Sequence, residues 1–202
     1  AESWAKRSGM VQWGGDRKRT SVANWRLPIK WNAQAQAEVR RYRVFCSSLA
    51  DVFDNQVPSD WRDDLFALIK STPNLDWLLL TKRPENFFTN TLAAALLLAD
   101  SHNDEGLLEW ITLWSKDHRP PANVWVGTSV EDQTRANERI PKLLGIPAAV
   151  RFLSVEPLLD PVDLHRVQFP RLSGGTGSVR ARNRLWFVFL PKSLFQSNHR
   201  IR

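Results

Sequence analysis

NVWVGTSVEDQTRANERIPKLLGIPAAVRFLSVEPLLDPVDL, residues 123–164, is the stretch that decides the fold. Two apolar runs, at 124–127 and 150–155, flank a segment whose apolar residues recur at helical spacing: Ala136, Ile140, Leu143 and Leu144. Pro141 is expected to restart this helix and Gly145 to end it. Strand, helix and strand within about 35 residues predict a βαβ unit, in which the two strands are parallel.

The same alternation extends toward the N-terminus. Strands are expected at 43–47 and 76–81, in addition to 124–128 and 150–155. A helix opening at 59–60 should bury Trp61, Leu65, Leu68 and Ile69, and one opening at 84 should bury Phe88, Leu92, Ala95 and Ala99. The apolar strands do not alternate with polar residues, so both faces of a parallel sheet should be buried. Four such strands suit either a partial barrel or an open doubly wound sheet.

Charge divides the chain into three parts. Residues 1–43 carry ten Lys/Arg and three acidic residues, and residues 44–164 carry ten Lys/Arg and eighteen acidic residues. Residues 165–202 carry eight Lys/Arg and no acidic residue. Residues 1–42 are predicted to be an irregular basic segment with a short helix at 34–41. Residues 165–202 are predicted to be a basic, disordered tail, in which 185–190 could add to the sheet as an edge strand.

The basic ends at 1–43 and 165–202 could bind nucleic acid, since cations attract phosphates and four tryptophans lie among the N-terminal cations. The alternative is that the tryptophans fix this segment to the core and that the flanks are solvated without a partner. No apolar run is long enough to cross a membrane and no signal-peptide core is present, so the cytoplasm is the default location.

Several classes of site are excluded by the sequence. Cys46 is the only cysteine, so the 202 residues cannot form an internal disulfide framework or a multi-cysteine metal site by themselves. A lone cysteine at the end of a strand is usually a small buried hydrophobe. No Ser/His/Asp arrangement, Walker loop or zinc spacing is present, and no metal ligands are predicted.

Polar residues follow each predicted strand, at the end where parallel α/β folds bind ligands. In chain order the candidates are Ser47 and Asp51, Lys82 and Arg83, Ser129 and Glu131, and Ser154 and Glu156. Lys82 and Arg83 could bind a carboxylate or phosphate, and the two glutamates could accept hydrogen bonds from an amine or a ribose. The alternative is that these residues cap the strands and pair with one another across the mouth of a barrel.

Five stretches carry a resemblance to a known family: AESWAKRSG, RVFCSSLADVFD, DWLLLTKRPENF, NVWVGTSVEDQ and IPAAVRFLSVEPLLDPVDL. They resemble a phage- and bacterium-associated family of unknown function, which looks like the radical S-adenosylmethionine (SAM) enzymes and is marked by three cysteines near its N-terminus. The resemblance covers residues 1 to about 164. It implies a partial TIM-type barrel. The residue pattern itself, apart from the resemblance, predicts that 101–121 is an insertion, helical around Leu107, Ile111 and Trp114.

The same resemblance implies a 4Fe–4S cluster, held by three thiolates, and SAM bound at its open iron. In the family, the last cysteine directly precedes Tyr-Ala-Glu, and this sequence starts at Ala1-Glu2. The family also continues past its equivalent of Leu164 with further barrel strands, which the tail does not match. We therefore expect a truncated or frame-shifted family member that binds no cofactor and is inactive. The substrate of the family is unknown. The alternative is a noncatalytic nucleic-acid-binding or interaction protein that uses its basic ends.

Overall fold

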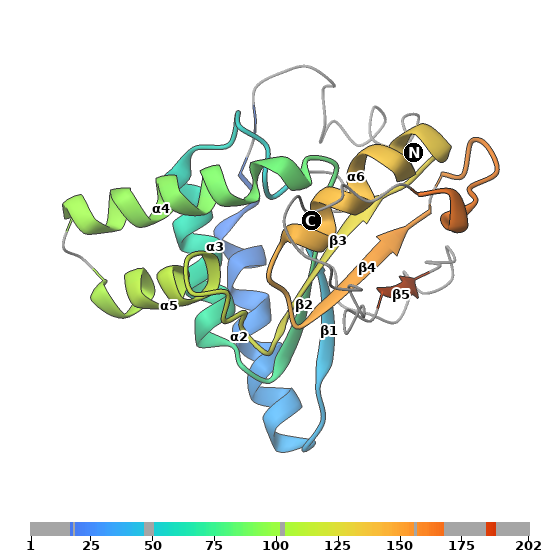
Figure 1. Cartoon of the computed structure of the whole chain (residues 1–202). Helices are drawn as coiled ribbons and strands as arrows, with labels where there is room; N and C mark the ends of the chain where they lie inside the picture. The colour runs from blue at the N-terminus through green and yellow to red at the C-terminus, as the bar shows by residue number, and fades with distance from the viewer. Residues whose placement is uncertain are drawn as a thin grey trace.

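A computed structural model describes residues 17, 19–46, 51–101, 104–155, 157–167 and 185–188 (Figure 1). Strands and helices alternate along the chain. In order they are α2 (Val22–Ala37), β1 (Tyr42–Cys46), α3 (Ser59–Ser71), β2 (Leu75–Thr81), η1 (Pro84–Asn86), α4 (Phe87–Ser101), α5 (Glu105–Ser115), β3 (Val124–Ser129), α6 (Gln133–Gly145), β4 (Val150–Ser154), η2 (Leu164–Arg166) and β5 (Leu185–Val188), where η marks a 3-10 helix. Within these described parts, no helix has the length and apolar character that crossing a membrane requires.

The five strands form one sheet in the order β1-β2-β3-β4-β5, and each neighbouring pair is parallel. Each connection therefore moves one strand further in the same direction. Since such crossovers are nearly always right-handed, they place their helices on one face, whereas a doubly wound sheet reverses direction at a switch point. The strand order is therefore consistent with a partial parallel α/β barrel. In Figure 1, α3, α4 and α5 gather on one side of the fanned strands.

Both faces of the sheet carry apolar side chains, as the lack of alternation predicts. One face enters the hydrophobic core beneath the helices through Val44, Trp77, Leu79, Val126 and Leu153. The strand positions between them place other apolar residues on the opposite face: Phe45, Leu78, Leu80, Trp125 and Phe152. Near the start of the strands, the Arg43 guanidinium lies 4.9 Å from the centre of the Trp125 ring.

The predicted strands are confirmed to within one residue at each end. The helix expected in the 101–121 segment is α5, whose buried residues are the three predicted ones, Leu107, Ile111 and Trp114. Because α5 packs against α3 and α4, this segment belongs to the helical layer of the domain.

The buried face of α4 differs from the predicted one. Phe88 and Leu92 were placed in the core by the sequence pattern, but they are 43% and 58% exposed. The buried face includes Asn90 and Thr91 instead. Asn90 donates a hydrogen bond of 3.0 Å to the Phe53 carbonyl, and Thr91 donates to a carbonyl of its own helix. Because both polar groups have partners, they can be buried at low cost.

A similar rotation affects α3. Trp61 and Leu65 are only partly buried, whereas Arg62 and Asp63 are buried. The Arg62 guanidinium donates to carbonyls in the loop 51–58 at 3.2 Å. Burial lowers the pKa of this arginine, yet the loop carbonyls supply the acceptors that a buried cation requires. A charged residue therefore takes a core position that the hydrophobic pattern assigned to its neighbours.

Two helices contain an internal proline, and at one of these, Pro141, the sequence predicts a restart. The N-terminal segment predicted to be irregular contains the 16-residue α2, with Pro28 inside it and Ser21 accepting a hydrogen bond from the Asn24 N–H. It starts well before the short helix expected at 34–41. Likewise, α6 continues through Pro141 and ends at Gly145. Pro28 is buried, and such tertiary packing can outweigh the loss of one backbone hydrogen bond.

The tail contributes an edge strand, as the apolar run at 185–190 suggested. Leu185–Val188 forms β5 and pairs in parallel with β4, from Arg151↔Leu185 to Ser154↔Val188. Residues 168–184 and 189–202 lie outside the described residues, so the disorder expected for them stays a prediction.

Asp63 should make the stability of the fold depend on pH. One of its carboxylate oxygens is buried without a hydrogen-bond partner among the described residues, and burial raises the pKa of Asp63 to about 6 despite the charge of Arg62. The folded protein therefore binds a proton on the Asp63 carboxyl group more tightly than the unfolded chain does. This contribution to stability is complete below about pH 4 and falls by roughly 2–3 kcal/mol as the pH rises through 6.

We expect Asp63→Asn to remove that loss. The urea midpoint of the variant should exceed that of the wild type at about pH 7.5 and match it at about pH 4. Asp60→Asn is the matched control, because Asp60 lies in the same helical turn but is exposed. A pH-independent difference between Asp63→Asn and the wild type would contradict the assignment.

Candidate functional site

The ends of strands β1 to β3 bring four of the predicted site residues into two groups of ion pairs. The Asp51 cluster consists of Asp51, Asp54, Thr81, Arg83 and Arg17. The Glu131 cluster consists of Glu131, Lys82 and Arg139. Because Lys82 and Arg83 are consecutive at the end of β2, the two clusters lie side by side. Two other predicted residues, Ser47 and Glu156, lie outside the described residues.

Asp51 fastens the loop after β1 to the end of β2. Its Oδ1 accepts a hydrogen bond of 2.6 Å from the Thr81 hydroxyl. Its Oδ2 accepts bonds from the Lys82 backbone N–H at 2.9 Å and from the Arg83 guanidinium at 3.0 Å. The Thr81 hydroxyl in turn accepts from the Arg83 N–H. This carboxylate therefore sets the conformation of the Lys82–Arg83 segment through both oxygens.

Asp54 anchors the same loop to the N-terminal part of the chain. Its Oδ2 accepts from the Arg17 guanidinium, with the Nε bond at 3.0 Å, and lies 3.8 Å from Arg83. Burial acts to raise the pKa of Asp54. A hydrogen bond from the Gln56 N–H and the charges of Arg17 and Arg83 outweigh burial, so the pKa lies below its usual value. Asp54 is therefore ionised at neutral pH.

Glu131 joins the ends of β2 and β3 to α6. Its Oε1 lies 3.0 Å from the Lys82 ammonium, and its Oε2 accepts a 2.9 Å bond from Arg139. Burial acts to raise the pKa of Glu131, but the hydrogen bond and charge of Lys82 and the charge of Arg139 outweigh it, so the pKa is lowered. The Glu131 carbonyl also accepts from the Leu159 N–H at 2.8 Å, which holds the loop after β4.

Two of the three predicted serines, Ser129 and Ser154, lie at the same edge of the sheet. Ser129 and Ser154 are partners in the β3–β4 register and are both buried. The Ser154 carbonyl accepts from the Val130 N–H at 2.8 Å, and the Ser129 carbonyl accepts from Arg139. Both serines are far less exposed than Lys82 and Arg83.

Two of the cations in these clusters, Lys82 and Arg83, are much more exposed than the carboxylates, whereas the Arg139 side chain is only 11% exposed. The carboxylate side chains of Asp51, Asp54 and Glu131 are 11%, 8% and 10% exposed. The side chains of Lys82 and Arg83 are 57% and 42% exposed. Solvent therefore meets cationic groups backed by buried carboxylates. Such a surface is suited to an anionic group of a ligand.

Sequence reasoning missed several members of the clusters. Arg17 lies 37 positions before Asp54, and nothing in the sequence links the two. Arg139 is partly buried on α6, one residue before the core residue Ile140. Its position beside the apolar face of a predicted helix was the only sequence feature that could have indicated a role in the site. The expected alternative, that strand-end residues pair with one another, is seen for Lys82–Glu131 and Arg83–Asp51.

The described residues do not fit an iron–sulfur cluster. Cys46, the single cysteine in the sequence, is buried and belongs to the hydrophobic core beneath the helices. A 4Fe–4S cluster of the implied type needs three thiolates. Among the described residues, no group of three or more His, Cys, Asp or Glu side chains is arranged to hold a metal ion.

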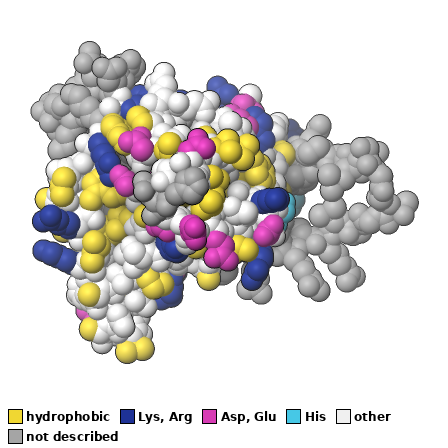
Figure 2. All heavy atoms as spheres, turned by 90° about the vertical axis from the view of Figure 1, so that its left-hand side faces the viewer, with side chains coloured by type: hydrophobic (Ala, Val, Ile, Leu, Met, Phe, Trp, Pro, Cys, Tyr) yellow, Lys and Arg dark blue, Asp and Glu magenta, His cyan; other side chains and the backbone are white. Residues whose placement is uncertain are grey.

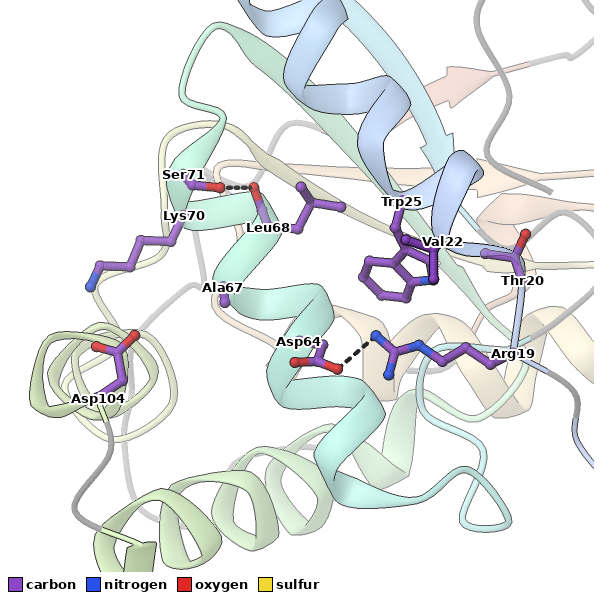
Figure 3. Close-up of a pocket in the computed structure, with 10 residues that line it drawn as sticks. All are labelled: Arg19, Thr20, Val22, Trp25, Asp64, Ala67, Leu68, Lys70, Ser71 and Asp104. Atoms are coloured by element: carbon purple, nitrogen blue, oxygen red, sulfur yellow. Dashed lines mark hydrogen bonds and ion pairs between the residues drawn. The ribbon is translucent and has the colours of Figure 1, made fainter.

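A separate groove of about 820 Å³ lies on the helical side, between α2, α3 and the start of α5 (Figure 3). None of its described lining residues is a predicted site residue. Arg19 lies 4.4 Å from the centre of the Trp25 ring and forms a 2.6 Å ion pair with Asp64. Trp31 is buried. These two tryptophans thus pack against the protein, while those at 4 and 13 lie outside the described residues.

A comparison with family models gives a match over most of the chain. The model of DUF5131, described as "Protein of unknown function (DUF5131)", matches residues 1–190. No curated protein and no solved structure matches the chain significantly. The matched range includes β5 and extends past Leu164, where the sequence resemblance was expected to end. Because the match covers nearly the whole chain, the protein belongs to the DUF5131 family.

Proposed function

We propose that the strand-end clusters bind the carboxylate group of a small-molecule ligand, and that this ligand is SAM, as in the phage-associated, radical-SAM-like proteins that the sequence resembles. The observation that carries the proposal is the exposure of Lys82 and Arg83 above buried carboxylates. A ligand carboxylate arriving at this edge meets two cations held in position by the fold. The ligand site is thus proposed for the loops after β1, β2 and β3.

Ligand binding need not leave a buried carboxylate without partners. If Arg83 turns toward a ligand, Asp51 still accepts from Thr81 and from the Lys82 N–H. If Lys82 does so, Glu131 still accepts from Arg139. A buried acceptor without a donor would cost free energy, and the donors that remain at Asp51 and Glu131 prevent this. The clusters can therefore exchange an internal ion pair for one with the ligand.

The proposed activity of these 202 residues is binding without radical chemistry. In radical SAM enzymes an iron–sulfur cluster supplies the electron that cleaves SAM, and the single thiol of Cys46 does not meet the requirement for that cluster. What the residues themselves can do is orient a carboxylate at Lys82 and Arg83. No substrate beyond this ligand is assigned.

We expect Lys82→Gln and Arg83→Gln each to weaken SAM binding by roughly 10- to 100-fold, because a charge-assisted hydrogen bond contributes about 1.5–3 kcal/mol. Isothermal titration calorimetry with SAM measures this loss. Arg40→Gln is the matched control, since Arg40 is an exposed residue paired with Glu38 just before the start of β1, at the opposite end of the strands. 5′-Methylthioadenosine lacks the carboxylate, so its binding should be weaker and insensitive to both substitutions. The proposal fails if the wild type does not bind SAM or if the three variants bind it alike.

The competing interpretation, nucleic-acid binding through the basic ends, is weakened by two arginines. Arg17 and Arg19 neutralise Asp54 and Asp64 within the protein, so they are not available to phosphates without breaking those pairs. Fluorescence anisotropy with a labelled single-stranded oligonucleotide is the direct comparison. Tight binding that weakens steeply with salt, together with no SAM binding, would favour this interpretation.

A further inference from the structure

The outer face of α4 carries an apolar ridge. Phe88, Leu92 and Leu96 recur at every fourth position and are 43%, 58% and 58% exposed, and Leu97 beside them is 41% exposed. No charged residue occurs between Phe87 and Ala99. Residues four apart form one continuous row on a helix, so these side chains make a single exposed strip. Apolar strips of this kind usually mark an interaction surface.

The spacing of the ridge is symmetric about Leu92. If a second α4 helix packs against it in antiparallel orientation, Leu92 meets Leu92 of the second copy. Phe88 then meets Leu96, and Leu96 meets Phe88. A two-fold axis through Leu92 therefore matches large apolar side chains with one another, as an isologous interface requires.

Charges beside the ridge favour the same orientation. The acidic residues Asp104 and Glu105 follow the C-terminal end of α4 at the start of α5, and both are exposed. Figure 2 looks onto this end of the molecule, where acidic and hydrophobic side chains gather. The cations Lys116 and Arg119 follow α5, at the opposite end of the α4–α5 pair. His118, between them, lies 6.2 Å from Phe88 (ring centre to ring centre), so this segment is next to the ridge.

An antiparallel pair therefore brings the acidic end of each copy to the basic end of the other. Asp117 lowers the net charge of the basic end but does not reverse it, because two cations flank one acid. The dipoles of the two α4 helices also oppose each other in this arrangement. A parallel pair would instead place acidic end against acidic end. The complementarity of the surface with itself thus points to a second copy as its occupant.

We propose that the protein self-associates through the α4 ridge, as an antiparallel two-fold pair centred on Leu92. This interface lies on the helical layer and does not depend on the proposed ligand. In sedimentation equilibrium, the wild type should show a concentration-dependent monomer–dimer equilibrium. Leu92→Asp should weaken it by roughly 100-fold or more, since two like charges would meet on the axis. Ile29→Asp is the control, because Ile29 is equally exposed at 56% but lies on α2.

Cysteine crosslinking in a Cys46→Ser background tests the register. Leu92→Cys should form a disulfide-linked dimer by itself on mild oxidation. Phe88→Cys and Leu96→Cys should crosslink efficiently only when the two variants are mixed, because opposed Cβ atoms must lie about 4 Å apart. A wild type that remains monomeric at all concentrations would overturn the proposal. Preferential self-crosslinking of Phe88→Cys over crosslinking in the mixture would indicate a parallel pair and would also overturn it. A Leu92→Asp variant that dimerises as well as Ile29→Asp would overturn it too.

Discussion

Gly127→Ala is expected to destabilise the fold by about 3 kcal/mol, an effect near the upper end for overpacking in a protein core. Gly127 and Phe152 are partners in the β3–β4 register, and the aromatic ring covers the glycine. A Cβ atom at 127 would lie 2.4 Å from two carbons of that ring. Phe152 is fully buried, so the ring cannot move away without displacing its neighbours. Urea unfolding of both proteins measures the difference.

Two further variants separate this clash from a general effect of glycine replacement. Gly145→Ala at the end of α6 meets nothing within 4 Å, so it should leave stability unchanged or raise it by up to about 1 kcal/mol. Phe152→Leu should reduce the cost of Gly127→Ala, because the smaller side chain leaves room for the methyl group. Equal destabilisation by Gly127→Ala in the two backgrounds would show that Phe152 is not the cause.

The strands could be predicted from the sequence because each is a short apolar run followed by polar residues. Parallel pairing followed from the helical patterns between the runs. The order of the strands could not be predicted, since a partial barrel and a doubly wound sheet use the same alternating elements. The sheet order distinguishes them only because successive connections keep one direction.

The helix faces were harder to predict because they depend on partners rather than on hydrophobicity. On α4, leucines and alanines cover both faces, and the hydrogen bond from Asn90 to the Phe53 carbonyl helps to decide which face is buried. On α3, Arg62 is buried because the loop after β1 presents carbonyls to it. Neither acceptor can be located before the loop has a conformation. The exposed α4 ridge is the direct result of this choice of face.

The candidate site was predictable in part for the same reason. Parallel strands end at one edge, so the residues after β1, β2 and β3 were expected to meet there, and Asp51, Arg83, Lys82 and Glu131 do. The contributions of Arg17 and Arg139 come from elements whose approach depends on tertiary packing. Exposure also could not be predicted, and it is the exposure of the cations that supports the ligand proposal.

Anaerobic reconstitution of the 202-residue protein with iron and sulfide is expected to give no stoichiometric 4Fe–4S cluster and no reductive cleavage of SAM. The reason is the number and position of thiols. A cluster with one open iron needs three cysteines grouped on one loop, and the single cysteine here is buried in the core on β1. Optical absorption with iron and sulfide analysis tests for the cluster, and detection of 5′-deoxyadenosine tests for SAM cleavage.

Two variants make this expectation decisive. Cys46→Ser should behave like the wild type, because a buried core thiol does not contribute to cluster assembly. An N-terminal extension that carries three closely spaced cysteines and ends in Cys-Tyr before Ala1 should gain cluster absorbance if the β/α core is radical-SAM-like. In that protein, Lys82→Gln should lower SAM cleavage without lowering iron content, since Lys82 is assigned to the ligand carboxylate. Stoichiometric cluster in the unextended protein would refute the thiol argument, whereas a loaded cluster whose SAM cleavage ignores Lys82→Gln would refute the strand-end assignment.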